Sequence, residues 1–131
     1  MKTSDPEIHL IPYLYRGQII ISFDTTNGTP ARYDEKGYRV YDIRENGTLK
    51  TQFTANIGIR PPEKFEFYLL TDSKETIPLQ LASDKKSQET DIVVSDVYIL
   101  NNEMHYFVDT LKNMAKYKNP AIDKNERTVK Q

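Results

Sequence analysis

Apolar and polar side chains alternate along several short segments between residues 8 and 108, and turn-forming residues separate these segments. A period of two is typical of β-strands that cover a core with one face. Clear examples are the segments 7–12 (EIHLIP), 18–23 (QIIISF) and 65–70 (FEFYLL). A further candidate, 77–81, contains Pro78 and is therefore expected at a sheet edge. The pattern predicts a mainly β protein: an antiparallel β-sandwich of about seven strands with a short C-terminal helix, similar in layout to prealbumin-like or immunoglobulin-like modules.

Residues 38–53 (YRVYDIRENGTLKTQF) show the alternation most clearly, with Asn46-Gly47 at the centre. A two-residue loop at Asn46-Gly47 would mix charged and apolar residues on one face. A three-residue loop, 45–47, places Gly47 at a left-handed position and sets Asp42 opposite Lys50. It also creates an apolar face from Tyr41, Ile43, Leu49 and Phe53. We therefore predict a hairpin in which Asp42 pairs with Lys50.

The segment from residue 92 to 118 allows two interpretations. Residues 92–100 (IVVSDVYIL) are strand-like, but the apolar residues that follow fit one face of a helix from about residue 103 to 118. Alternatively, a turn at Asn101-Asn102 leads to a strand over 104–108. A short helix over 110–117 then follows, with Asp109 or Thr110 as its N-cap.

The length of 131 residues suits one domain rather than two. We expect a single β-sandwich domain over residues 8–118, a flexible N-terminus over 1–7 and a disordered basic tail over 119–131. The net charge of −1 disfavours a nucleic-acid partner, and the absence of cysteine excludes disulfides. No window is apolar enough for a transmembrane segment. The start of the chain lacks the apolar stretch of a signal peptide, although an export signal could have been removed.

Two motifs resemble those of a bacterial domain family that has no assigned activity. Leu10-Ile11-Pro12 and Gly17 are similar to the family's I-P-x-G-x-x-G motif, and residues 39–53 resemble its R-V-Y-x-I-P-x-x-G-x-L-x-T-Q-F motif. Family members look like exported proteins, often lipoproteins. The resemblance therefore implies an extracytoplasmic protein, periplasmic or at the cell surface, with a lipid anchor in its full-length form. It also favours the strand-then-helix interpretation, because residues 107–110 (FVDT) are similar to an F-x-V-G-T element that precedes a short helix in the family.

The sequence contains none of the common hydrolase, zinc-protease or nucleotide-binding motifs. His9 and His105 are far apart along the chain, and we expect both to lie half exposed on strands rather than to hold a metal. A loop cluster carries oxygen atoms that would suit calcium, but its spacing is not that of an EF-hand, and turn formation explains it. This cluster consists of Asp24, Asn27, Asp34 and Glu35. We therefore expect no metal and no cofactor.

Tyrosine is the most informative residue type that remains, with nine in the chain. The candidates for contact with a ligand or partner are Tyr13, Tyr15, Tyr33 and Tyr38. Tyrosine joins apolar area to a hydrogen-bonding group, which suits both partner binding and half-buried packing. We expect a non-catalytic binding or structural module of the bacterial cell envelope that contacts a protein or a glycan. The alternative is a hydrolase of an envelope glycan or peptide, with carboxylates such as Asp24 and Asp34 as acid and base.

Overall fold

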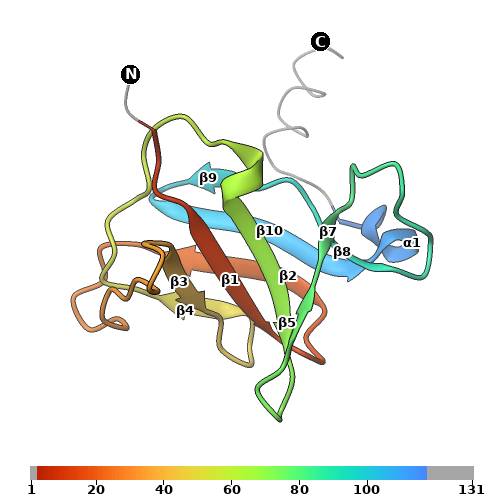
Figure 1. The fold of residues 1–131 in the computed structure, drawn as a ribbon, viewed down its shortest axis with the longest axis horizontal. Helices are drawn as coiled ribbons and strands as arrows, with labels where there is room; N and C mark the ends of the chain where they lie inside the picture. The colour runs from red at the N-terminus through yellow and green to blue at the C-terminus, as the bar shows by residue number, and fades with distance from the viewer. Residues whose placement is uncertain (1–2, 118–131) are drawn as a thin grey trace.

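The structure is a computed structural model, and it describes residues 3–117. The strands in this range are β1 (Glu7–Pro12), β2 (Gly17–Ser22), β3 (Arg39–Asp42), β4 (Thr48–Lys50), β5 (Phe65–Leu70), β6 (Thr76–Pro78), β7 (Gln80–Leu81), β8 (Ile92–Val94), β9 (Tyr98–Leu100) and β10 (Glu103–Thr110). The helices are short: a 3-10 helix at Pro62–Lys64 and α1 at Leu111–Met114. Figure 1 shows two layers of strands, with β1 and β5 in one and β2 and β10 in the other.

Both sheets are mixed. The first has the strand order β3-β1-β5-β6 and the second β4-β2-β10-β8-β7, with β9 also paired to β10. Four pairs are parallel: β1 with β3, β1 with β5, β2 with β4 and β7 with β8. The chain alternates between the layers from β1 to β5, so an even number of chain reversals separates the paired strands β1 and β3, β2 and β4, and β1 and β5, which leaves each pair parallel. The expectation of antiparallel sheets is therefore wrong, because both sheets contain parallel pairs, and the immunoglobulin-like or prealbumin-like layout is not confirmed.

The structure has more strands than the predicted seven or so, and the difference has local causes. The expected strand 77–81 is divided at Leu79, where the chain passes from β6 in the first sheet to β7 in the second. Pro78 does lie on an edge strand, as predicted. The apolar run 92–100 is divided into β8 and β9, which pair with different parts of β10.

The predicted hairpin between β3 and β4 does not form. Asp42 pairs with Leu10 in the first sheet, and Lys50 pairs with Ser22 in the second. The turn itself is present: Gly47 has a φ of +83° and donates a backbone hydrogen bond to Arg44 at 2.9 Å. Beyond this turn the two strands diverge into different layers. The predicted inward residues are nevertheless all buried, namely Tyr41, Ile43, Leu49 and Phe53.

The long connection between β2 and β3 covers the edges of two strands. The backbone N–H of Thr29 donates to the carbonyl of Lys50 at 2.8 Å, beside β4, and that of Val40 in β3 donates to Arg32 at 2.9 Å. Gly28 allows this close approach, because a Cβ atom there would lie 2.7 Å from the carbonyl oxygen of Lys50. Since an open strand edge invites pairing with other chains, this connection protects the fold.

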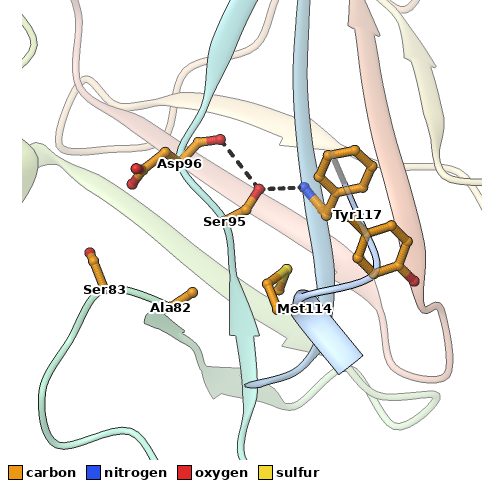
Figure 2. Close-up of a pocket in the computed structure, with 7 residues that line it drawn as sticks. Ala82, Ser83, Ser95, Asp96, Met114 and Tyr117 are labelled. Carbon is orange, nitrogen blue, oxygen red and sulfur yellow. Dashed lines mark hydrogen bonds between the residues drawn. The ribbon is translucent and has the colours of Figure 1, made fainter. Parts of the chain in front are cut away.

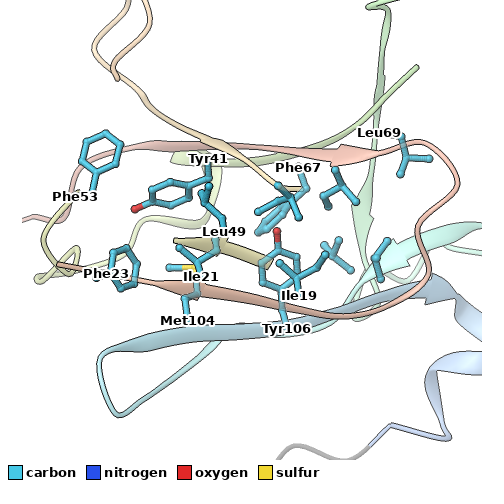
Figure 3. Packing of buried hydrophobic residues seen from close by; sticks show 14 residues of the cluster. Ile19, Ile21, Phe23, Tyr41, Leu49, Phe53, Phe67, Leu69, Met104 and Tyr106 are labelled. Carbon is cyan, nitrogen blue, oxygen red and sulfur yellow. The ribbon is translucent and has the colours of Figure 1, made fainter. Parts of the chain in front are cut away.

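The hydrophobic core lies between the sheets (Figure 3). Phe67 of β5 and Tyr106 of β10 meet across it, with ring centroids 5.2 Å apart. Both layers contribute to the buried cluster, which consists of Ile11, Ile19, Ile21, Phe23, Tyr41, Ile43, Leu49, Phe53, Phe67, Leu69, Val94, Met104, Tyr106 and Val108.

A fully buried carboxylate, Glu7, lies beside this core. Its Oε1 accepts a hydrogen bond from Nε2 of His9 at 2.8 Å, and its Oε2 accepts one from Asn56 at 2.7 Å. Nδ1 of His9 contacts the hydroxyl of Tyr106 at 2.8 Å, which joins the two sheets. Burial alone raises the pKa of Glu7, but the hydrogen bond and charge of His9, with Asn56 and Arg60, outweigh burial and lower it.

Arg39 extends this buried network towards the surface. It donates to Asp5 at 3.0 Å and to the hydroxyl of Tyr41 at 3.2 Å, and its guanidinium lies 4.6 Å from the ring centroid of Phe53. Tyr41 in turn donates to Oε2 of Glu7 at 3.2 Å. At least five residues of the R-V-Y-x-I-P-x-x-G-x-L-x-T-Q-F motif therefore have a structural role in or beside the core, namely Arg39, Tyr41, Ile43, Leu49 and Phe53.

The C-terminal segment follows the strand-then-helix interpretation, and a long helix from residue 103 is wrong. Asn101 and Asn102 form the turn with φ values of 52° and 62°. Thr110 is the N-cap of α1, and its hydroxyl accepts from the backbone N–H of Asn113 at 3.1 Å. The predicted tail at 119–131 lies outside the described residues. Glu7 belongs to β1, and the expected flexibility of residues 1–7 stays a prediction.

Candidate functional site

A groove of about 400 Å³ lies on the outer face of the first sheet, away from the core. We call it the outer groove. It is lined by Ile8, Leu10, Arg32, Asp34, Glu35, Lys36, Tyr38, Val40, Glu66, Tyr68 and Thr76. Its volume lies in the range of small-molecule sites, about 300–1,000 Å³. The groove is thus large enough to hold a small ligand or one unit of a polymer.

The floor of the outer groove follows directly from the alternation in β1, β3 and β5. Glu7, His9 and Ile11 point into the core from β1, so Ile8 and Leu10 point outward between them. Val40 takes the same outward position on β3, where it pairs with Ile8. The neighbouring strand β5 pairs with β1 on the other side and adds Glu66 and Tyr68. Three strands therefore supply an apolar floor with polar groups along one border.

A tight turn at residues 34–38 forms the opposite border. Oδ1 of Asp34 accepts hydrogen bonds from the backbone N–H groups of Lys36 and Tyr38, both at 2.9 Å. The backbone N–H of Asp34 also donates to the carbonyl of Tyr38 at 2.8 Å. These bonds fix the backbone that carries Tyr38, so the ring is attached to a defined turn.

Tyr68 and Glu66 form a hydrogen-bonded pair within the outer groove. They are two residues apart on β5 and share its outward face, and the hydroxyl of Tyr68 donates to Oε1 of Glu66. This hydrogen bond, together with burial and the charge of Glu66, raises the pKa of Tyr68 to about 12. Tyr68 therefore stays a neutral phenol at physiological pH and holds the carboxylate in place.

The four tyrosines predicted from the sequence do not form one site. Tyr38 lines the outer groove. Tyr33 is exposed and lies edge-on to Phe53, with ring centroids 5.3 Å apart. Tyr13 and Tyr15 lie in the loop after β1, at the end of that strand opposite to its pairing with Arg39. The hydroxyl of Tyr15 donates to the carbonyl of Gln18, which indicates a structural role.

Sequence reasoning did not identify Tyr68 and Glu66 as members of a site. The signal was present in the segment FEFYLL, since an alternation that buries Phe67 and Leu69 must expose Glu66 and Tyr68 on the other face. The alternation could not show which strands lie beside β5. The outward faces of β1 and β3 meet that of β5 only because the chain returns to the first sheet after visiting the second.

The two carboxylates proposed for a hydrolase are not brought together. Asp34 lines the outer groove, whereas Asp24 lines a separate hollow of about 320 Å³ with Arg39 and Asn102. Asn102 donates to Oδ2 of Asp24 at 3.1 Å. Within residues 3–117 there is also no group of three or more His, Cys, Asp and Glu residues that could hold a metal ion.

The two histidines occupy different environments, and the expectation that they lie half exposed is wrong. His9 is fully buried in the network around Glu7. His105 is only 8% exposed and stacks on Tyr98, with ring centroids 5.0 Å apart. Its Nε2 lies 3.2 Å from Oε1 of Glu103. His9 thus belongs to the buried network between the sheets, whereas His105 packs against Tyr98 of the second sheet.

A second hollow, of about 340 Å³, lies between α1 and the segments that flank β8 (Figure 2). It is lined by Ala82, Ser83, Ser95, Asp96, Phe107, Met114 and Tyr117. Ser95 Oγ accepts from the backbone N–H of Phe107 at 2.8 Å, and Phe107 stacks on Tyr117 with ring centroids 4.6 Å apart. Ser95 and Tyr117 are already hydrogen-bonded within the fold, which leaves Ser83 and Asp96 as the other polar side chains that line this hollow.

The fold and the outer groove define a two-layered mixed β domain with a surface groove on one sheet. Residues 3–122 match the family of unknown function DUF6843. The chain belongs to this family, which confirms the resemblance to a family without an assigned activity. A comparison with curated proteins finds no match.

Among solved structures, the chain is similar to a crystal structure at 2.75 Å resolution described as a "Putative Lipoprotein from Bacillus anthracis". The similarity has a TM-score of 0.55 and covers 98% of this chain and 94% of the other, at 16% sequence identity. At this identity the likeness concerns the fold alone. In the part of the chain that the structure describes, no helix has the length and apolar character needed to cross a membrane.

Proposed function

We propose that this chain is a non-catalytic binding module of the bacterial cell envelope, which holds its partner in the outer groove. The observation that carries the proposal is the groove itself: Ile8, Leu10 and Val40 form an apolar floor, with Tyr38 and Tyr68 beside it. A concave apolar surface with a few fixed polar groups is the usual form of a ligand site. Tyrosines 13, 15 and 33, which lie elsewhere, are not part of this proposed site.

The envelope location is supported by two likenesses. The sequence resembles a family of exported proteins, and the fold is similar to that of a protein described as a putative lipoprotein. An envelope protein meets polymers of sugar and peptide outside the cytoplasm, and a surface groove of this volume can hold one unit of such a polymer. The separation of Asp24 from Asp34 into different hollows does not support a hydrolase that uses these two carboxylates as acid and base.

The test is co-sedimentation of the purified chain with bacterial cell-wall sacculi, which contain both glycan and peptide. We expect the wild-type chain to sediment with the sacculi, and the Tyr38→Ala/Tyr68→Ala variant to bind at least tenfold more weakly. The matched control is Tyr13→Ala/Leu14→Ala, which removes two exposed apolar side chains from a different loop. Circular dichroism of each variant checks that the fold is kept.

Equal binding by the groove variant and the wild-type chain would place the site elsewhere, and no binding at all would reject the sacculus as partner. Release of soluble sugar or peptide fragments during the incubation would favour the hydrolase. Fractionation of the native bacterium tests the location: recovery of the protein only from the cytoplasm would reject the envelope.

A further inference from the structure

We infer that the outer groove binds a neutral glycan, with the C–H face of a pyranose ring on the apolar floor and a pair of hydroxyl groups on the carboxylate of Glu66. This inference rests on the proposed function and names the ligand class of the same site. It follows from the shape of the floor, from the balance of charges around it, and from the way the nearby strand edge is covered.

The floor of the groove is the face of a sheet rather than a deep hole. Ile8 and Val40 are paired neighbours on β1 and β3, and Leu10 lies two residues beyond Ile8 on the same face. Such a surface matches the broad, weakly polar C–H face of a pyranose ring. The rings of Tyr38 and Tyr68 add faces with negative charge density, which attract the partly positive C–H groups of a sugar.

The charged groups of the groove nearly cancel. Two cations, Arg32 and Lys36, oppose three carboxylates, Asp34, Glu35 and Glu66, for a net charge of −1. A strongly charged ligand would be attracted by the groups of one sign and repelled by the groups of the other. A neutral polyol can use both, because each sugar hydroxyl donates one hydrogen bond and accepts others.

Glu66 is placed to act as the acceptor for sugar hydroxyls. Tyr68 donates to Oε1 of Glu66, and among residues 3–117 no hydrogen bond reaches Oε2. Asp34 is less free, because its Oδ1 already accepts from two backbone N–H groups of its own turn. A fixed carboxylate with an open oxygen accepts strong, charge-assisted hydrogen bonds from adjacent hydroxyls.

The groove is poorly suited to an extended peptide. Peptides that bind beside a sheet usually add a strand to an open edge. The edge of β3 next to the groove is occupied, since Val40 donates its backbone hydrogen bond to Arg32 and Tyr33 bridges to Arg39. The floor of the groove presents side chains of β1 and β5, whose backbone groups pair with neighbouring strands on both sides. The apolar and polar side chains of the groove can therefore contact the ring and the hydroxyl groups of a sugar.

The experiment titrates the full chain with a neutral tetramer of N-acetylglucosamine, followed by calorimetry and by NMR shifts of the groove residues. We expect saturable binding, with shifts that include Ile8, Val40 and Tyr68. Glu66→Gln should weaken binding at least tenfold, and Tyr38→Ala by a similar factor. Tyr68→Phe keeps the ring but releases Glu66, and should weaken binding less than Glu66→Gln. Tyr33→Ala is the control, because this exposed tyrosine does not line the groove.

A competition assay separates failure of this inference from failure of the proposed function. If sacculi bind through the groove, and the tetramer of N-acetylglucosamine displaces them while the released peptides do not, the ligand is the glycan. If only the released peptides compete, or if Glu66→Gln binds the tetramer like the wild-type chain, the inference is overturned while the binding module stands. If sacculi do not bind the chain at all, the proposed function is rejected, and the titration with the tetramer alone tests the ligand class.

Discussion

Nε2 of His9 lies 2.8 Å from Oε1 of Glu7, and both side chains are completely buried. A buried carboxylate is costly unless hydrogen bonds and charge compensate it. Here Tyr41 and Asn56 occupy the second oxygen, and the pairing with Tyr106 links His9 to the opposite sheet. The pair therefore acts as a polar connection between the two layers.

Replacing Glu7 with Gln should destabilise the fold by about 1.5–3 kcal/mol at pH 7, because hydrogen bonds to a charged group are lost. The pKa of Glu7 is lowered from its ordinary value of 4.5. Its stabilisation is therefore fully present above pH 4.5 and is lost as the pH falls through the lower pKa of the folded state. Urea unfolding of both proteins between pH 3 and 7 measures this. The difference between them should shrink below pH 4.5, and a constant difference would contradict the assignment.

Gly28→Ala should lower the free energy of unfolding by about 1–3 kcal/mol, a typical cost of overpacking. The new Cβ atom would lie 2.7 Å from the carbonyl oxygen of Lys50 and 2.9 Å from the backbone nitrogen of Thr51, and backbone atoms cannot easily move away. Thermal or urea unfolding gives the value. Asn27→Ala, at the exposed neighbouring position, is the control and should change stability by less than about 0.5 kcal/mol.

Asp109→Ala should loosen α1 without unfolding the sheets. Asp109 is buried and accepts hydrogen bonds from Tyr117 at 2.6 Å and from Asn113 at 3.2 Å. Loss of these bonds should cost about 1–3 kcal/mol, and hydrogen exchange at the amide of Asn113 should become faster while that of β10 stays slow. Lys116→Ala is a useful comparison: its ammonium is 3.7 Å from Asp109 and largely exposed, so its removal should have little effect.

Glu66→Gln should lower the pKa of Tyr68 from about 12 towards the ordinary value of 10. A carboxylate that accepts the phenolic hydrogen bond disfavours the phenolate, so neutralising it removes most of the cause. NMR titration of carbon-13-labelled tyrosine measures the change, and Tyr68→Phe assigns the signal. A Tyr68 signal that titrates identically in both proteins would mean that the two side chains are not paired in solution.

The alternation between residues 38 and 53 shows what a sequence pattern can and cannot predict. It correctly predicted that Tyr41, Ile43, Leu49 and Phe53 are buried and that Gly47 adopts a left-handed conformation. It did not predict the partners, because two strands that diverge into separate layers need the same alternation as two strands of a hairpin. Register arguments test which side chains share a face, and both arrangements satisfy that test.

The candidate site could be predicted only in part, because the alternation shows which side chains share a face and does not show which strands are neighbours. Tyr38 was among the expected contact residues, and the outer groove includes it. Glu66 and Tyr68 were recognisable as outward residues of a strand, but their neighbours were not. The buried network around Glu7 was not predicted either, since charged residues on a strand are ordinarily expected in water.

The sequence by itself determined the β class, most strand positions, the turn at Gly47 and the inward residues between 41 and 53, and it left the turn at Asn101-Asn102 as one of two interpretations. These depend on local periodicity and backbone conformation, which neighbouring residues decide. Only the tertiary structure decided which strands pair, that the pairs β1–β3, β1–β5 and β2–β4 are parallel, and where the outer groove forms. Each of these depends on the path of the chain between two layers, and that path is set by how distant apolar faces fit together.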